Sequence, residues 1–246
     1  MMLGCEELSA ERGGATVLHG VTTALEPGKI TAICGPNGAG KSSLLLALAG
    51  LLQPLSGTVR IGDDKLSGLH PRERARRIGY LPQEAEVAWD VAVENIVRLG
   101  RLPYRDRGDE AVERAIAALD LEPLRHRPAS QLSGGEKARA LLARVLAGEP
   151  SWILADEPLA ALDLSHQLAL LRHLRAAASQ GTGVVLVLHD LALAMNQADR
   201  VLVMQKGRLV ADGPPEIALA KDVIADVWQV AAHWLGEPGA RALVTR

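Results

Sequence analysis

The chain has 246 residues, of which 48% are apolar, and this size allows one large folded core or a core with an inserted subdomain. Lys and Arg number 27 against 29 Asp and Glu, so the net charge of -2 offers no positive field to attract nucleic acid or anionic lipid. The apolar runs are shorter than the roughly 18 to 20 residues that span a bilayer, and glutamates occupy the start where an export signal has basic residues.

The first third of the chain predicts a strand, a glycine-rich loop and a helix in succession. Short strand patterns and a turn at residues 26–28 surround the apolar run 30–34, which is typical of a buried strand. A helical pattern then extends from Lys41 to about Leu52. Cys34 lies in the buried run and Cys5 near the start, which fits reduced structural thiols better than a disulfide.

The pattern changes between about Val91 and Ala147. Helices with arginine-rich polar faces are expected there, including residues 110–119 and the stretch after Ser133. Short apolar runs then return at 152–155 and 184–188 with a helix at 165–179 between them, as a parallel sheet with a crossover helix requires. A hairpin is expected over 201–210, and Pro214-Pro215 opens a tail that we expect to be helical.

One loop predicts a phosphate site. Gly35-Pro36-Asn37-Gly38-Ala39-Gly40-Lys41-Ser42, the glycine loop, matches G-x-x-x-x-G-K-[ST] and stands between the predicted strand and helix. Its backbone N–H groups and the helix N-terminus can wrap a polyphosphate, while Lys41 supplies a positive charge and Ser42 a ligand for Mg²⁺. Ser43 is grouped with these ATP-binding residues as a helix residue rather than a second metal ligand.

Two adjacent carboxylates end the apolar run 152–155. Because neighbouring strand residues point in different directions, Asp156 can face Mg²⁺ while Glu157 faces the terminal phosphate as general base. An acidic strand end before Pro158 is by itself equally consistent with an ordinary turn. The glycine loop favours the catalytic interpretation.

The segment Leu132-Ser133-Gly134-Gly135-Glu136, the signature segment, indicates the class. With the glycine loop and the acidic pair, the sequence resembles the ABC ATPase family from about Leu18 to Trp228. The resemblance implies an α/β fold: a P-loop NTPase (RecA-like) core with an antiparallel β subdomain and an inserted α-helical subdomain. It also implies that the signature segment closes over the ATP of a second, identical subunit.

The resemblance implies one ABC ATPase domain over residues 1–246. The nucleotide-binding core with its β subdomain is expected at 1–83 and 149–213, the helical subdomain with the signature segment at 84–148, and a C-terminal tail at 214–246.

Further family landmarks follow in order. Gln83 matches a glutamine that contacts Mg²⁺ and the catalytic water, and His189 matches a histidine that contacts the terminal phosphate. Asp163 ends Ala160-Ala161-Leu162-Asp163, the aspartate loop, which crosses the dimer interface, although the family usually has Ser where Ala160 stands. Arg12 occupies the place where an aromatic ring commonly stacks on adenine, and its planar guanidinium could stack there instead.

Residues 91–105, with Gly100-Arg101-Leu102-Pro103, resemble the subgroup that serves importers of iron-siderophores, haem and cobalamin. Molybdate or another metal chelate stays an alternative cargo. The resemblance implies a homodimer at the cytoplasmic face of the membrane, bound to permease subunits and indirectly to a periplasmic or lipoprotein substrate-binding protein, with no nucleic-acid partner.

Two rival interpretations share these motifs. A soluble ABC ATPase could act on nucleic acid or ribosomes, but such proteins carry a long coiled coil or two cassettes, and here one compact segment separates Ser42 from Ser133. A regulatory cassette could bind ATP without hydrolysing it, and Gln83, Glu157 and His189 argue against that alternative.

Overall fold

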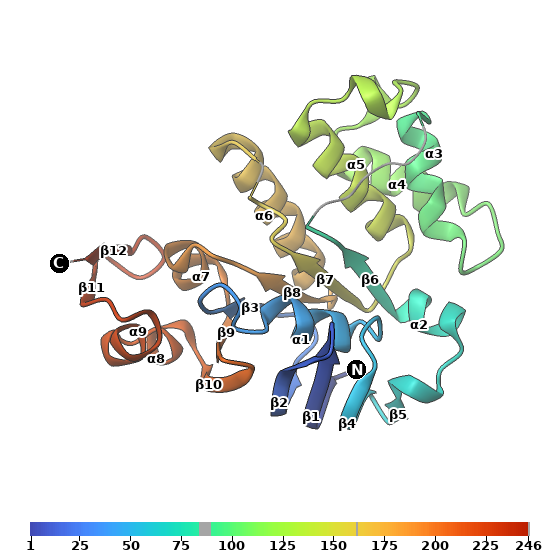
Figure 1. Cartoon of the computed structure of the whole chain (residues 1–246). Helices are drawn as coiled ribbons and strands as arrows, with labels where there is room; N and C mark the ends of the chain where they lie inside the picture. Colours follow the sequence, from blue (N-terminus) through green and yellow to red (C-terminus); the bar gives the residue numbers. More distant parts are fainter. Residues whose placement is uncertain (84–89, 161, 246) are drawn as a thin grey trace.

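The computed structural model describes residues 1–83, 90–160 and 162–245, and two larger sheets organise them (Figure 1). Their strands are β1 (Leu3–Arg12), β2 (Ala15–Leu25), β3 (Ile30–Cys34), β4 (Pro54–Ile61), β5 (Asp64–Lys65), β6 (Ile78–Leu81), β7 (Trp152–Asp156), β8 (Gly183–Val187), β9 (Arg200–Gln205) and β10 (Arg208–Gly213). A small hairpin adds β11 (Ala232–Leu235) and β12 (Ala242–Thr245).

Nine helices lie between these strands in the described residues. They are α1 (Lys41–Leu48), α2 (Pro71–Arg77), α3 (Val93–Arg98), α4 (Asp109–Ala118), α5 (Gly134–Ala147), α6 (Leu164–Ser179), α7 (Leu191–Gln197), α8 (Pro215–Ala218) and α9 (Lys221–Trp228). In the described residues, α3 to α5 follow one another without an intervening strand, as do α8 and α9. Short 3₁₀ turns occupy Leu66–Gly68, Leu99–Arg101, Glu122–Leu124 and Ala129–Gln131.

The central sheet has the order β10-β9-β3-β8-β7-β6, parallel from β9 to β6, with β10 antiparallel at its edge. Strands β3, β7 and β8 are buried along their whole length, because helices or the second sheet cover both faces. Their sequences are therefore mainly apolar, with Thr31 in β3 and Asp156 at the end of β7 as the buried polar exceptions. The predicted parallel sheet is confirmed.

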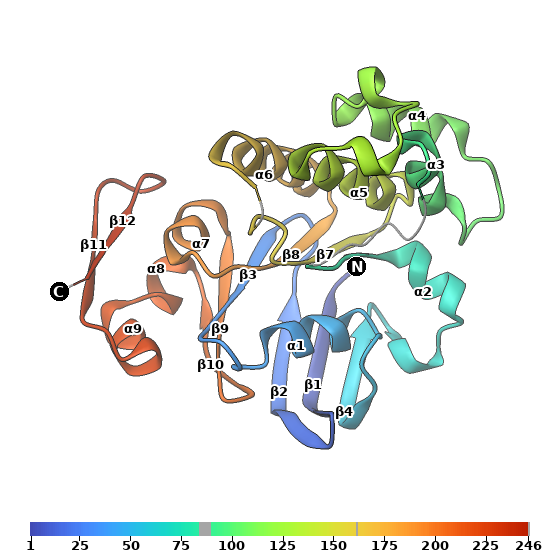
Figure 2. The same ribbon diagram turned by 45° about the horizontal axis from the view of Figure 1, so that its top comes forward.

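Alternate residues of these strands belong to two separate hydrophobic cores. Val184 and Leu186 pack with α5, α6 and α7 on one face, whereas Val185 and Val187 pack with α1 and the antiparallel sheet β2-β1-β4-β5 on the other. Figure 2 shows α1 between the antiparallel strands and the central sheet. The period of two along a strand thus divides one apolar run between two cores.

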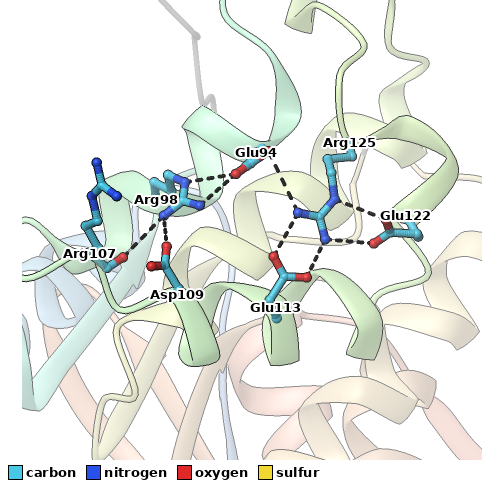
Figure 3. A network of polar contacts seen from close by, with 7 residues as sticks. All are labelled: Glu94, Arg98, Arg107, Asp109, Glu113, Glu122 and Arg125. Carbon is cyan, nitrogen blue, oxygen red and sulfur yellow. Dashed lines mark hydrogen bonds and ion pairs between the residues drawn. The ribbon is translucent and has the colours of Figure 1, made fainter.

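Helices α3, α4 and α5 form a block to one side of the sheet (Figures 1 and 2). Ion pairs hold its surface: Arg98 pairs with Glu94 and Asp109, and Arg125 pairs with Glu113 (Figure 3). The block lies within the predicted helical subdomain 84–148, of which residues 84–89 fall outside the described part of the chain. The proposed domain boundaries stay a prediction.

The Gly100-Arg101 turn is fixed to the C-terminal end of α5. The Arg101 guanidinium is buried, donates to the Ala147 carbonyl at 3.1 Å, and pairs with Asp106 and Glu149 at 2.8 and 2.9 Å. It also lies 3.9 Å from the centre of the Tyr104 ring. This turn, which the sequence links to a subgroup of importers, therefore has a clear structural role.

Two expectations need correction. Helix α1 ends at Leu48 instead of near Leu52, because Gly50 adopts a left-handed backbone with φ 69° and the Leu51 N–H returns to the Leu46 carbonyl. The tail is not wholly helical, since the hairpin β11–β12 follows α9, with the turn glycines Gly236 and Gly239 between its strands.

The hairpin lies beside α7 and α9, on the side of the molecule away from α3 and α4 (Figures 1 and 2). Asn196 of α7 exchanges two hydrogen bonds with the backbone of Arg241, each 2.8 Å long, and the Trp234 indole donates to the Leu219 carbonyl. Among the described residues, no helix combines the length and apolar character needed to cross a bilayer.

Candidate functional site

The glycine loop joins the end of β3 to the start of α1. Gly35 has φ 151°, and a Cβ at this position would lie 2.2 Å from the Met204 carbonyl oxygen, so only glycine fits against β9. Gly40 caps α1 in a left-handed conformation with φ 96°. Asn37 and Gly38 are exposed at the outer edge of the loop, where a ligand can approach.

Lys41 bends back into the curve of the glycine loop. Its ammonium donates to the carbonyl oxygens of Gly35 and Pro36 at 2.9 and 3.0 Å, and the residue is only 5% exposed. Burial lowers the pKa of Lys41, while the charges of Glu157 and Asp156 act in the opposite direction. The sequence therefore places a desolvated cation inside the predicted phosphate cradle.

Ser42 and Asp156 meet across two elements. The Ser42 hydroxyl, in the first turn of α1, donates to Oδ1 of Asp156 at the end of β7 over 3.0 Å. Burial raises the pKa of Asp156, because the carboxylate is removed from water. A hydroxyl and a buried carboxylate side by side are the hard oxygen donors that Mg²⁺ prefers, so the residues fit this ion. Ser43 is buried within α1.

The Glu157 carboxylate contacts two other predicted catalytic residues, Gln83 and His189. Its Oε2 accepts a hydrogen bond from Gln83 Nε2 at 2.7 Å, and its Oε1 contacts His189 Nε2. The Glu157 side chain is only 12% exposed, and its backbone is left-handed at φ 49°, a conformation uncommon outside glycine. Gln83, Glu157 and His189 follow β6, β7 and β8, so the ends of three neighbouring parallel strands create this cluster.

The signature segment begins helix α5 with a capping box. Ser133 Oγ accepts from the Glu136 N–H at 3.3 Å, and the Glu136 carboxylate accepts from the Ser133 N–H at 2.8 Å. Ser133 and Gly134 are exposed. In the described part of the chain, no hydrogen bond or ion pair joins the signature segment to the glycine loop.

The remaining predicted residues lie at the ends of strands and helices or in turns. Asp163 is the N-cap of α6, and its carboxylate accepts from the His166 N–H and the Ser165 hydroxyl. Arg12 is exposed at the end of β1. Ala160 precedes Ala161, which falls outside the described residues.

One residue of this region was missed from the sequence. The imidazole ring of His166 contacts the Asp163 carboxylate through Nδ1 and packs against Gly135. His166 therefore lies between the aspartate loop and the signature segment. The available signal was its place three residues after an N-cap Asp, from which a side chain can reach back to the cap.

Comparison with known proteins decides the family. The sequence profile of the ABC transporter family matches residues 18–160, more than half of the chain. The chain belongs to the ABC transporter family. Curated members include the hemin import ATP-binding protein HmuV of Streptomyces coelicolor, 44% identical over 96% of this chain and 86% of the relative. HmuV of Pseudomonas entomophila is 43% identical over 93% of each chain.

Solved ABC transporter structures share the fold. A structure described as an inward-facing conformation of a metal-chelate type ABC transporter has a TM-score of 0.84 at 26% identity, covering 99% of this chain and 97% of that one. A dimeric ATP-binding cassette in a post-hydrolysis state with ADP and phosphate has a TM-score of 0.76 at 28% identity, covering 87% and 98%. The predicted ABC ATPase fold is confirmed, and this ABC transporter chain binds and hydrolyses ATP.

Proposed function

We propose that this chain is the ATP-hydrolysing subunit of an importer that takes up a metal chelate of the iron-siderophore, haem or cobalamin type. The observation that carries ATP hydrolysis is the convergence of Gln83 and His189 on Glu157, next to the Ser42–Asp156 pair and the glycine loop that surrounds Lys41. The likeness to hemin import proteins supports the importer part of the proposal. A chain that only bound nucleotide would not need a carboxylate held by two polar neighbours at the strand ends.

The residues divide the reaction between them. The backbone N–H groups of residues 35–42 and the Lys41 ammonium would hold the phosphates of ATP. Ser42 and Asp156 would hold Mg²⁺, with Gln83 as a further ligand, and the bound ion would neutralise charge on the β and γ phosphates. Glu157 would accept a proton from the attacking water, while Gln83 and His189 orient its carboxylate.

We infer that catalysis requires a second copy of the chain. The exposed tip of α5 offers the Ser133 hydroxyl and a helix N-terminus to an anion, yet it makes no polar contact with the glycine loop of its own chain among the described residues. A partner's triphosphate would supply that anion. The related post-hydrolysis cassette is itself a dimer, which supports this arrangement.

The cargo and location follow from the relatives. HmuV proteins are named for hemin import, and they match nearly the full length of this chain. Haem is therefore the cargo that we favour, recognised by a separate binding protein and moved through permease subunits, with this chain at the cytoplasmic face. The Gly100-Arg101 turn secures α5 and offers no specificity for cargo.

The rival functions fit less well. A soluble ATPase acting on nucleic acid or ribosomes would share the cluster around Glu157, but the similar proteins above are transporter subunits. Incubation with nucleic acid should leave the ATPase rate unchanged, whereas co-expressed permease should raise it.

The decisive experiment compares three purified proteins in the presence of Mg-ATP. It measures the rate of phosphate release and the molar mass in solution, which distinguishes a monomer from a dimer. The wild type should hydrolyse ATP, Glu157→Gln should bind ATP and accumulate as a dimer without turnover, and Lys41→Ala should lose ATP binding. A Glu157→Gln variant that hydrolyses ATP at the wild-type rate would remove Glu157 from its role. A Glu157→Gln variant that binds ATP and stays monomeric would contradict the proposal that ATP is bound between two copies of the chain.

A further inference from the structure

Three donors converge on one carboxylate oxygen at the start of α6. Asp163 Oδ1 accepts hydrogen bonds from the His166 N–H at 3.0 Å and from the Ser165 hydroxyl at 2.9 Å, and the ring atom Nδ1 of His166 lies 2.7 Å away. An N-cap Asp needs only the backbone bond to begin a helix. The ring contact is additional, and it fixes one edge of the imidazole.

The carboxylate determines which nitrogen of His166 carries hydrogen. The backbone N–H of His166 and the Ser165 hydroxyl lower the pKa of Asp163 to about 2, so near neutral pH this group is ionised and can only accept. Nδ1 therefore donates, whether the ring is neutral or charged. The rest of the ring is free to make a second contact.

That second contact is with the signature segment. A Cβ on Gly135 would lie 2.5 Å from Cδ2 of the His166 ring and 2.8 Å from its Nε2, closer than such atoms can approach. The imidazole thus fills the space that any side chain at position 135 would need. Gly135 is buried beneath it, although Ser133 and Gly134 are exposed.

We propose that His166 is a positioning residue that fastens the aspartate loop to the tip of α5, so that Asp163 and Ser133 keep a fixed spacing. The inference rests on the proposed function, in which the tip of α5 faces the partner copy, and on the family resemblance, which implies that the aspartate loop crosses the same interface. His166 makes no contact with ATP in this role. It sets the distance between two groups that must engage the partner together.

We expect the contacts of His166 with Asp163 and Gly135 to affect turnover more than nucleotide binding. The proposed ATP cradle lies in residues 35–42, and within the described part of the chain His166 makes no hydrogen bond to them, so its removal should leave KM for ATP nearly unchanged. Loss of one hydrogen bond and its packing should lower kcat about three- to tenfold and weaken ATP-driven pairing.

The test uses four variants, each alone and in the Glu157→Gln background. His166→Ala removes both contacts, His166→Asn offers a donor to Asp163 without the ring, and His166→Phe keeps a ring against Gly135 without the donor. Arg172→Ala, an exposed position on the same helix, is the matched control. Phosphate release gives kcat and KM, light scattering gives the ATP concentration for half-maximal pairing, and thermal melting reports the fold.

We expect His166→Ala to lower kcat with KM within about twofold, to raise the ATP concentration needed for pairing, and to be partly rescued by His166→Asn and His166→Phe. Arg172→Ala should match the wild type. Wild-type kcat and pairing in His166→Ala would overturn the inference and leave the proposed function standing. If the Ala variant does not fold, an unimpaired His166→Phe and His166→Asn pair overturns it equally.

A double-mutant cycle tests the contact itself. Gly135→Ala should lower the melting temperature in the wild type, where the new methyl group meets the ring, and lower it less in His166→Ala, where that space is free. Equal losses in both backgrounds would overturn the contact. An inactive wild type, together with a Glu157→Gln variant that never pairs, would instead reject the proposed function.

Discussion

Gln83 donates a hydrogen bond from Nε2 to Oε2 of Glu157 over 2.7 Å, joining the ends of β6 and β7 at the candidate catalytic carboxylate. Among the described residues, the other polar contact of this side chain is that of Oε1 with His189. The position of Glu157 therefore depends on both neighbours.

We predict that Gln83→Ala lowers kcat roughly tenfold, the effect of losing a hydrogen bond of about 1.4 kcal/mol to a charged group. KM for ATP should change little, because the glycine loop is untouched and Ser42 and Asp156 would still hold Mg²⁺. Steady-state phosphate release gives both constants, with Gln53→Ala at an exposed site as control. An unchanged kcat would show that Gln83 does not orient Glu157.

Arg12 stands where other family members commonly have an aromatic ring that stacks on adenine, and its role can be tested by mutation. If its exposed guanidinium stacks on the base, Arg12→Ala should weaken ATP binding about two- to fivefold, since exposed cation–π contacts contribute about 0.5–1 kcal/mol. Arg12→Trp should bind ATP more tightly. Calorimetry with ATP and GTP checks both, and unchanged affinity and base preference in Arg12→Ala would exclude stacking.

The Arg101 turn predicts a loss of stability. Arg101→Ala removes the bond to the Ala147 carbonyl, two ion pairs and the contact with Tyr104, so the free energy of unfolding should fall by about 1–3 kcal/mol. Arg114→Ala breaks two exposed pairs, one with the same Glu149 and one with Glu110, and should change the free energy of unfolding by less than about 0.5 kcal/mol. Urea unfolding measures both, and equal losses would contradict the role of burial.

The two cysteines predict a pH-dependent reactivity. Burial raises the pKa of Cys5 to about 11 and that of Cys34 to about 12, so neither thiol should react with a disulfide reagent at pH 8 in the native protein. Both should react in denaturant, while an added Ser179→Cys should react at once as an exposed control.

The sign of the stability effect follows from the same shifts. A thiol whose folded pKa is raised stabilises the fold fully below its ordinary value near 9.0, and this contribution is lost as pH rises toward 11 and 12. The melting temperature should therefore fall over that range. Two rapidly reacting thiols in the native protein at pH 8 would contradict their burial.

The sequence could predict the central sheet and the glycine loop because their chemistry is local. Residues 30–34 are all buried and, apart from Thr31, apolar because both faces are covered, and Lys41 follows its loop directly. Parallel strands also bring Asp156, Glu157 and His189 to one edge of the sheet, so strand ends far apart in sequence could be grouped without coordinates.

Long-range packing could not be predicted in the same way. The His166 ring against Gly135 depends on how α6 lies beside α5, which no residue pattern specifies. The hairpin β11–β12 was missed because its strands are short and only partly buried, which gives a weak alternation. The structural role of Arg101 likewise arises from a carbonyl 46 residues away in sequence.

Helix α5 is held at both ends, by the buried Arg101 at its last turn and by the partly exposed His166 ring at its first. Gly100 and Arg101 hold its last turn, and His166 rests on its first, while 14 helical residues between them span about 21 Å. A hydrogen-bonded helix compresses little along its axis. Any displacement of the Gly100 turn would consequently arrive at Ser133 almost undiminished, which makes α5 a strut between two distant surfaces of the molecule.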